Sequence, residues 1–205
     1  FPPRTTTTLS TPSEEPASLK TLIKALNLTP HIEGGYYVET DRSPLTLPSP
    51  FPLKPSSTTS GLVPTRPGFD PSLRSLSTTI FYLLTPSGPQ GGFHRNSART
   101  VHTLHRGRGR YVIIHADEGE EGAEKRVETF VVGGNVVEGG KFKASFLLPD
   151  MEGGEESEGL LISETVVPGF EYVDHDFLAP GGLVELVGKE KAEDLSWLLS
   201  PLGKK

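Results

Sequence analysis

Short apolar runs that alternate with polar residues dominate the chain from residue 76 onward. Turns rich in glycine, proline or acidic residues bound each run. A period of two predicts β-strands, and a spacing of roughly 8–15 residues favours an antiparallel sandwich or barrel over alternating strand–helix units. The predicted strands are 76–84, 100–105, 110–115, 127–132, 142–148 and 160–167, with a further strand-like run at 35–40.

Helical periodicity is confined to the two ends of the chain. Near the N-terminus, an apolar stripe begins after Ser18, a good N-cap, and ends at Asn27. Residues 189–205 predict a closing helix. The side chains expected to pack inward are Leu19, Leu22, Ile23 and Leu26 in the first helix, and Leu195, Leu198 and Leu199 in the last.

Two segments show no sustained periodicity. Residues 1–17 are rich in proline and threonine, which predicts a disordered N-terminal arm. Residues 44–74 contain eight prolines. Because proline cannot donate to a sheet ladder, we expect this segment to be a surface insertion that contributes little to the core. The organisation predicted is one domain, residues 18–202, with an insertion at 44–74.

Composition excludes several classes of function. The 205 residues include no cysteine, so a disulfide framework, a zinc–thiolate site and a cysteine nucleophile are all excluded. The net charge of −6 argues against nucleic acid as a partner. No apolar run is long enough to span a membrane, and no secretory signal is recognisable. We therefore expect neither nucleic acid nor membrane as a partner, and a cytoplasmic location.

Two stretches resemble a known family. Residues 30–43 (PHIEGGYYVETDRS) resemble the opening signature, PHxEGGYYxET, of an RmlC-like cupin family of unknown function. Residues 166–179 (VVPGFEYVDHDFLA) are similar to the closing strand of the same family. The resemblance implies an all-β double-stranded β-helix, the cupin jelly roll, with a short helix at each end. It also implies a homodimer and a small-molecule ligand inside the barrel.

The general cupin motif, G-x5-H-x-H-x(3,4)-E-x6-G, usually supplies metal ligands. Gly88, His94 and Gly107 keep its frame, whereas Asn96 and Thr100 replace the second histidine and the glutamate. The histidine of the second half of the motif is also missing at its place. One imidazole with a neutral amide and a hydroxyl is a weak ligand set, so we expect no resident metal or other cofactor.

His102 shares strand parity with Thr100 and is therefore expected to face the barrel interior with it. Three interpretations of His94 and His102 stay open. The two histidines can be an acid–base pair, because imidazole titrates near neutral pH and isomerases and epimerases need a proton shuttle. They can hold a relocated metal together with Glu39, or line a pocket without chemistry.

Other side chains are candidates through their place on a strand. Tyr37 and Glu39 share one face, and a buried Glu39 would have a raised pKa and could act as a base. Tyr82 is predicted to be core or pocket wall. Glu33 is expected to accept backbone N–H groups of a tight turn, and the five arginines from Arg95 to Arg110 to attract an anionic ligand or form a solvated loop face. We expect a structural role for His31, and solvent-facing positions for His105, His115 and His175.

The sequence thus predicts a small-molecule-binding cupin, favoured as a metal-independent isomerase or epimerase of a polar or anionic metabolite. A metal-dependent oxygenase or lyase with displaced ligands and a non-catalytic binding protein are the alternatives. The predicted catalytic residues are His94, His102 and Glu39, and the predicted ligand-binding residues are Tyr37, Tyr82, Asn96 and Thr100.

Overall fold

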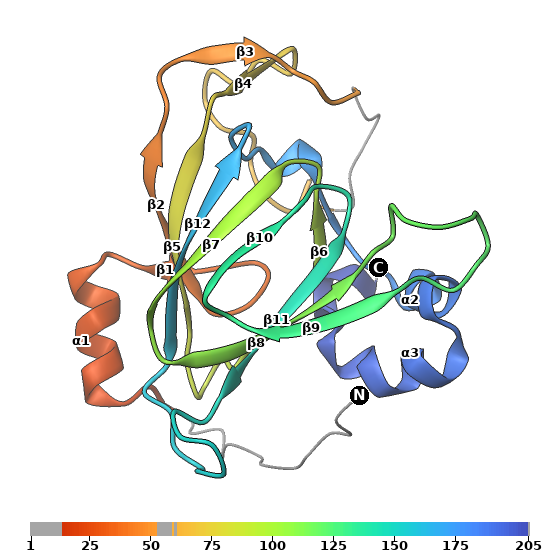
Figure 1. Cartoon of the computed structure of the whole chain (residues 1–205). Coiled ribbons are helices and arrows are strands. Elements are labelled where there is room, and N and C mark those ends of the chain that lie inside the picture. Colours follow the sequence, from red (N-terminus) through yellow and green to blue (C-terminus); the bar gives the residue numbers. More distant parts are fainter. Residues whose placement is uncertain (1–13, 53–58, 60, 205) are drawn as a thin grey trace.

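The computed structural model describes residues 14–52, 59 and 61–204. Two antiparallel sheets face each other in a barrel-like jelly roll (Figure 1). The six-stranded sheet has the order β1 (Thr29–Pro30), β2 (Tyr36–Arg42), β5 (Thr78–Leu84), β12 (Leu160–Val167), β7 (Arg99–Arg106) and β10 (Gly134–Val137). The five-stranded sheet has the order β13 (His175–Phe177), β6 (Gln90–Asn96), β11 (Phe142–Leu148), β8 (Arg108–Ile114) and β9 (Val127–Val131). The all-β jelly roll predicted from the sequence is confirmed.

The interior of the barrel is divided along its axis. One half is apolar and is filled by side chains such as Leu84, Leu147 and Leu160. Towards the other end, the inward positions become polar: in the six-stranded sheet, Glu164 on β12 is the direct register partner of Ile80 on β5 and of His102 on β7. Alternation along each strand thus points polar side chains into the barrel, where each needs a partner.

Helices cover the outer faces of both sheets (Figure 1). Helix α1 (Ala17–Ala25) packs Leu19 against Leu83 and Leu161 of the six-stranded sheet. Helices α2 (Pro180–Val187) and α3 (Lys189–Leu195) cover the five-stranded sheet. The closing helix predicted at 189–205 is α3 followed by two short 3-10 helices, Ser196–Leu198 and Pro201–Lys204, and α2 lies before the predicted range. The predicted N-cap at Ser18 is wrong, because the N-cap is Pro16, two residues earlier, and α1 begins at Ala17. Asn27 follows α1 with a positive φ of 54°, as suits a residue that ends a helix.

The structure describes only part of the predicted N-terminal arm and only part of the predicted insertion. Residues 1–13 of the arm, and residues 53–58 and 60 of the insertion, lie outside the described residues. The described part of the insertion includes a two-stranded ribbon of β3 (Thr46–Pro48) and β4 (Leu73–Ser75). Arg74 is buried and its guanidinium pairs with Asp174 at 2.7 Å, so the insertion is anchored in the protein. None of its described side chains belongs to the three hydrophobic core clusters, as expected for a segment that contributes little to the core.

Within the described part of the chain, no helix is long and apolar enough to cross a membrane.

Candidate functional site

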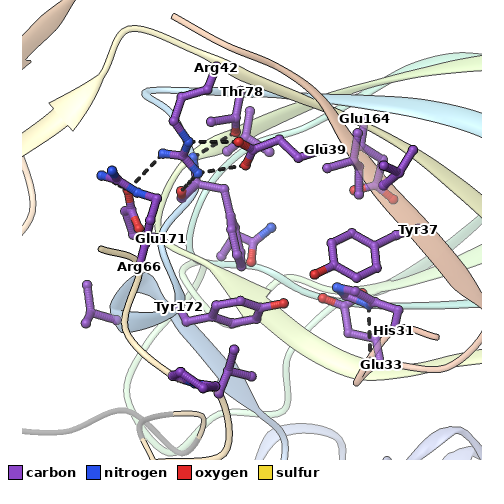
Figure 2. A pocket seen from close by; sticks show the side chains of 18 of the residues that line it. His31, Glu33, Tyr37, Glu39, Arg42, Arg66, Thr78, Glu164, Glu171 and Tyr172 are labelled. Carbon is purple, nitrogen blue, oxygen red and sulfur yellow. Dashed lines mark hydrogen bonds and ion pairs between the residues drawn. The ribbon is translucent and has the colours of Figure 1, made fainter. Parts of the chain in front are cut away.

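A cavity of about 500 Å³ opens at the polar end of the barrel. Its walls come from β2, from residues 61–69 of the insertion and from the segment after β12. Tyr37 and Tyr172 point toward each other from opposite walls (Figure 2). Glu33 and Glu164 contribute carboxylates to its lining, and His31 contributes an imidazole. A long segment expected to be peripheral therefore helps to enclose the most polar part of the barrel.

Glu33 is the centre of a histidine cluster. Its Oε1 lies 2.9 Å from Nε2 of His175, and its Oε2 lies 3.4 Å from Nε2 of His94 and 3.6 Å from Nδ1 of His31. The rings of His94 and His175 stack with their centroids 5.1 Å apart. All four side chains are largely buried, although Glu33 and His31 still line the cavity.

Two glycines after Glu33 hold its carboxylate in this position. Gly34 and Gly35 have φ values of 115° and 66°, a region that favours glycine. A Cβ on Gly34 would lie 2.2 Å from the carbonyl oxygen of Gln90, and one on Gly35 would lie 2.4 Å from that of Leu83. The turn therefore packs directly against the backbones of β5 and β6, and this brings Glu33 close to His94.

The environment of the cluster keeps His31 and His94 neutral. Burial lowers the pKa of His94 to about 3, and burial also lowers the pKa of His31. For Glu33, burial by itself raises the pKa, but the facing imidazoles and the hydrogen bond from His175 outweigh it and hold this pKa well below its usual range. The cluster thus contains an ionised Glu33 carboxylate beside the neutral imidazoles of His31 and His94.

A second buried network joins the two sheets beside this cluster. Nζ of Lys143 on β11 donates to Oε2 of Glu164 at 2.7 Å and to Nε2 of His102 at 3.2 Å. The hydroxyl of Tyr111 donates to Oε1 of Glu164 at 2.9 Å. Burial raises the pKa of Glu164, but attraction to Lys143 more than offsets it and lowers this pKa to about 2. Burial lowers the pKa of His102 to about 4, so His102 is neutral as well.

The mouth of the cavity carries a chain of ion pairs (Figure 2). Arg42 pairs with Glu39 at 2.7 Å and with Glu171 at 2.8 Å. Arg66 of the insertion pairs with the same oxygen of Glu171 at 2.9 Å. Two guanidiniums and two carboxylates balance one another here, so the mouth has no excess of positive charge.

The structure separates the predicted catalytic residues. His94 and His102 both face the barrel interior, but His94 contacts Glu33, whereas His102 contacts Lys143 and Glu164. Glu39 lies at the cavity mouth with 40% of its side chain exposed and is paired with Arg42. Glu39 therefore lacks the burial expected of a base. Glu39, His94 and His102 also do not come together as a compact group of potential metal ligands.

The predicted ligand-binding residues divide in the same way. Tyr37 and Asn96 line the cavity. Thr100 and Tyr82 are buried but lie outside the lining of the cavity. The hydroxyl of Tyr82 donates to the carbonyl of Gly34 at 3.0 Å, so this side chain supports the turn that carries Glu33.

Several residues of the site were missed by the sequence reasoning. The expectation that His175 faces solvent is wrong, because its side chain is fully buried against Glu33. His115 is also buried and paired with Glu118, whereas His105 is exposed. The carboxylate of Glu33, expected to accept backbone N–H groups of its turn, instead faces the imidazoles of His31, His94 and His175. Two features of the sequence could have identified site residues. His175 is the first histidine after the position where the cupin motif lacks one, and Glu164 has inward parity on a predicted strand.

Comparison with known proteins agrees with this architecture. Residues 20–178 match the family described as cupin superfamily (DUF985). An uncharacterised protein of Saccharomyces cerevisiae is 44% identical over 195 residues, which cover 90% of this chain and 88% of the yeast protein. The structure of a hypothetical protein from Leishmania major superposes with a TM-score of 0.67 at 26% identity, over 88% of this chain and 97% of that chain.

A structure from Shewanella oneidensis superposes with a TM-score of 0.60 at 24% identity, over 88% of this chain and 96% of that chain. The family match spans most of the sequence, including both segments that carry Glu33 and His175. The chain therefore belongs to the cupin superfamily, in the family DUF985.

Proposed function

We propose that this chain binds a small polar organic molecule in the cavity of the barrel. The observation that carries the proposal is the lining of the cavity: two tyrosines, Tyr37 and Tyr172, face each other across it, and two carboxylates, Glu33 and Glu164, lie at its inner end. A volume of about 500 Å³ is in the range of small-molecule sites. Aromatic rings supply contact area, and hydroxyls and carboxylates orient a polar ligand.

The charges of the lining narrow the class of ligand. Lys143 offsets the charge of Glu164, but no lysine or arginine of the described residues pairs with Glu33, so the inner end keeps a negative charge that repels an anionic group. Arg42 and Arg66 are already engaged by Glu39 and Glu171 at the mouth. A neutral molecule that carries hydroxyl groups, such as a sugar or polyol, suits this lining better than an anion does. An anionic ligand requires an additional positive charge at the inner end.

Thermal-shift titrations of the purified chain test this proposal. The probes are neutral sugars and polyols, sugar acids such as D-glucuronate, and aromatic acids such as 4-hydroxybenzoate. We expect saturable stabilisation by a member of the neutral class, and weaker binding by Tyr37→Phe and Tyr172→Ala. Tyr36→Phe is the matched control, because Tyr36 packs on the outer face of the same strand against α1. Binding that Tyr37→Phe and Tyr172→Ala leave unchanged contradicts a site in this cavity.

A second candidate function is isomerisation or epimerisation of the bound molecule. Proton transfer needs an ionised acceptor and a protonated donor on one cavity at neutral pH. The carboxylates of Glu33 and Glu164 are ionised, although their lowered pKa values make them weak bases. Burial raises the pKa of Tyr172, so its hydroxyl stays protonated. Incubation in D2O with the compound that binds in the titrations, followed by mass spectrometry, distinguishes the two functions. Incorporation of deuterium at carbon supports catalysis, and its absence supports a binding protein.

A further inference from the structure

Three side chains from distant segments converge at the inner end of the cavity. Glu33 comes from the turn before β2, His94 from β6 and His175 from β13. One ligand atom of each lies within 4.8 Å of the other two. Among the described residues, one other group of potential ligands is this compact, formed by His115, Asp117 and Glu118 near the surface.

In both His94 and His175, the protein contacts Nδ1, the ring nitrogen that lies away from Glu33. Nδ1 of His94 lies 2.9 Å from the carbonyl oxygen of Gly92. Because a carbonyl only accepts, this nitrogen carries the proton, and Nε2 of a neutral His94 presents its lone pair to Oε2 of Glu33. On His175, Nδ1 lies 2.6 Å from Oγ1 of Thr59. Histidines that bind metals are commonly oriented by such a contact at the other ring nitrogen.

The lone pair of His94 and the oxygen of Glu33 are both electron donors, and they face each other at 3.4 Å. A cation between these two atoms would be attracted by both of them. Within the described part of the chain, neither lysine nor arginine forms an ion pair with Glu33. The other compact group differs, because Lys141 pairs with both Asp117 and Glu118 and already supplies its positive charge.

We propose that a divalent transition-metal ion binds to Glu33, His94 and His175 at the inner end of the cavity. Two imidazoles and one carboxylate suit zinc, iron, cobalt, nickel and manganese. Of the residues that the usual cupin motif supplies, this site uses His94 alone; Asn96 and Thr100 have no place in it. The site therefore differs from the metal-free interior expected from the motif.

The proposal deepens the proposed function, since it rests on the same cavity as the binding site. Glu33 lines that cavity, so an ion held by its carboxylate would be reached from the cavity. Oxygen atoms of the ligand are natural partners for such an open position. An ion also supplies the positive charge that an anionic ligand requires between two carboxylates.

Titration of the full chain with cobalt(II), after dialysis against EDTA, tests the site without any organic ligand. Visible absorption reports the coordination of cobalt, and calorimetry with zinc gives the stoichiometry. We expect about one ion per chain, and at least about tenfold weaker binding by Glu33→Gln and by His175→Gln. His115→Gln is the matched control, because it alters the second compact group, and it should bind as the parent does.

Circular dichroism shows whether each variant is folded, and His94→Gln replaces any variant that is not. The proposal is overturned if the parent chain does not bind cobalt. It is also overturned if Glu33→Gln, His175→Gln and His94→Gln all bind cobalt as the parent does, or if His115→Gln abolishes cobalt binding. The thermal-shift titrations are then repeated on metal-free chain. If an organic compound binds there although cobalt does not, the proposed function stands and only the metal site is rejected.

Discussion

Lys143 and Glu164 lie on strands of opposite sheets and form an ion pair of 2.7 Å inside the barrel. Both side chains are buried, and only 2% of the Lys143 side chain is exposed. Charges removed from water need a partner of opposite sign and further hydrogen bonds, which His102 and Tyr111 supply here. The polar half of the barrel is therefore held together by this network, whereas the other half is held together by apolar contacts.

Removing one member of this pair should destabilise the protein strongly. We expect Lys143→Met to lower the free energy of unfolding by about 3–5 kcal/mol, because it leaves the Glu164 carboxylate buried without its cation. Urea unfolding followed by circular dichroism measures the change. The double variant Lys143→Met with Glu164→Gln should recover part of the loss. A single variant as stable as the parent would show that the pair is not needed for the fold.

The same carboxylate should make stability depend on pH. The pKa of Glu164 is about 2 in the folded protein and 4.5 as its ordinary value. A lowered folded pKa gives stabilisation that is fully present above about pH 4.5 and is lost as the pH falls toward 2. Burial and the charge of Glu33 raise this pKa, whereas Lys143 and His102 lower it, and the Tyr111 hydroxyl faces the same carboxylate. Melting temperatures of the parent and of Glu164→Gln from pH 7 to 3 should therefore converge below pH 4.5, and a constant difference would contradict this assignment.

Arg74 should control the wall that the insertion gives to the cavity. Its guanidinium forms two hydrogen bonds with Asp174, at 2.7 and 3.0 Å, in a buried position. We expect Arg74→Ala to leave Asp174 unpaired and to increase hydrogen exchange in residues 61–74. Arg99→Ala is the control, because Arg99 pairs with Glu138 on the exposed surface. Equal protection of residues 61–74 in both variants would show that another contact anchors the segment.

Gly34→Ala should displace Glu33 from its cluster. The substitution puts a Cβ against the carbonyl of Gln90 and imposes a positive φ of 115° on an alanine. We expect a lower melting temperature and loss of cobalt binding. Gly181→Ala at the start of α2 is the control, because no atom lies within 4 Å of its added Cβ. Full cobalt binding by Gly34→Ala would mean that the turn does not position the carboxylate.

The strands and the family were accessible from the sequence because both depend on local patterns. Alternation predicted β11 and β12 with their observed bounds, and the two signature segments indicated the jelly roll. Strand β6 was missed, since its glycines and polar residues resemble a turn. The homodimer and the cytoplasmic location expected from the sequence stay predictions.

The site was harder to predict because its contacts join distant parts of the chain. Glu33 and His175 are 142 residues apart, and parity gives the face of a side chain but not its partner. Glu39 illustrates a further limit. Its strand position points it to the inner face, but its distance along the barrel places it at the exposed mouth. Depth along the axis depends on register between strands, which one sequence does not specify.

Residues 61–69 form a wall of the cavity but belong to neither large sheet. The histidines and the carboxylate at the inner end, in contrast, are fixed by the barrel and its glycine turn. The mouth and the inner end of the cavity are therefore built by separate parts of one chain. Grafting a different loop between β3 and β4 should change which compounds the cavity admits while leaving Glu33 and its histidines in place.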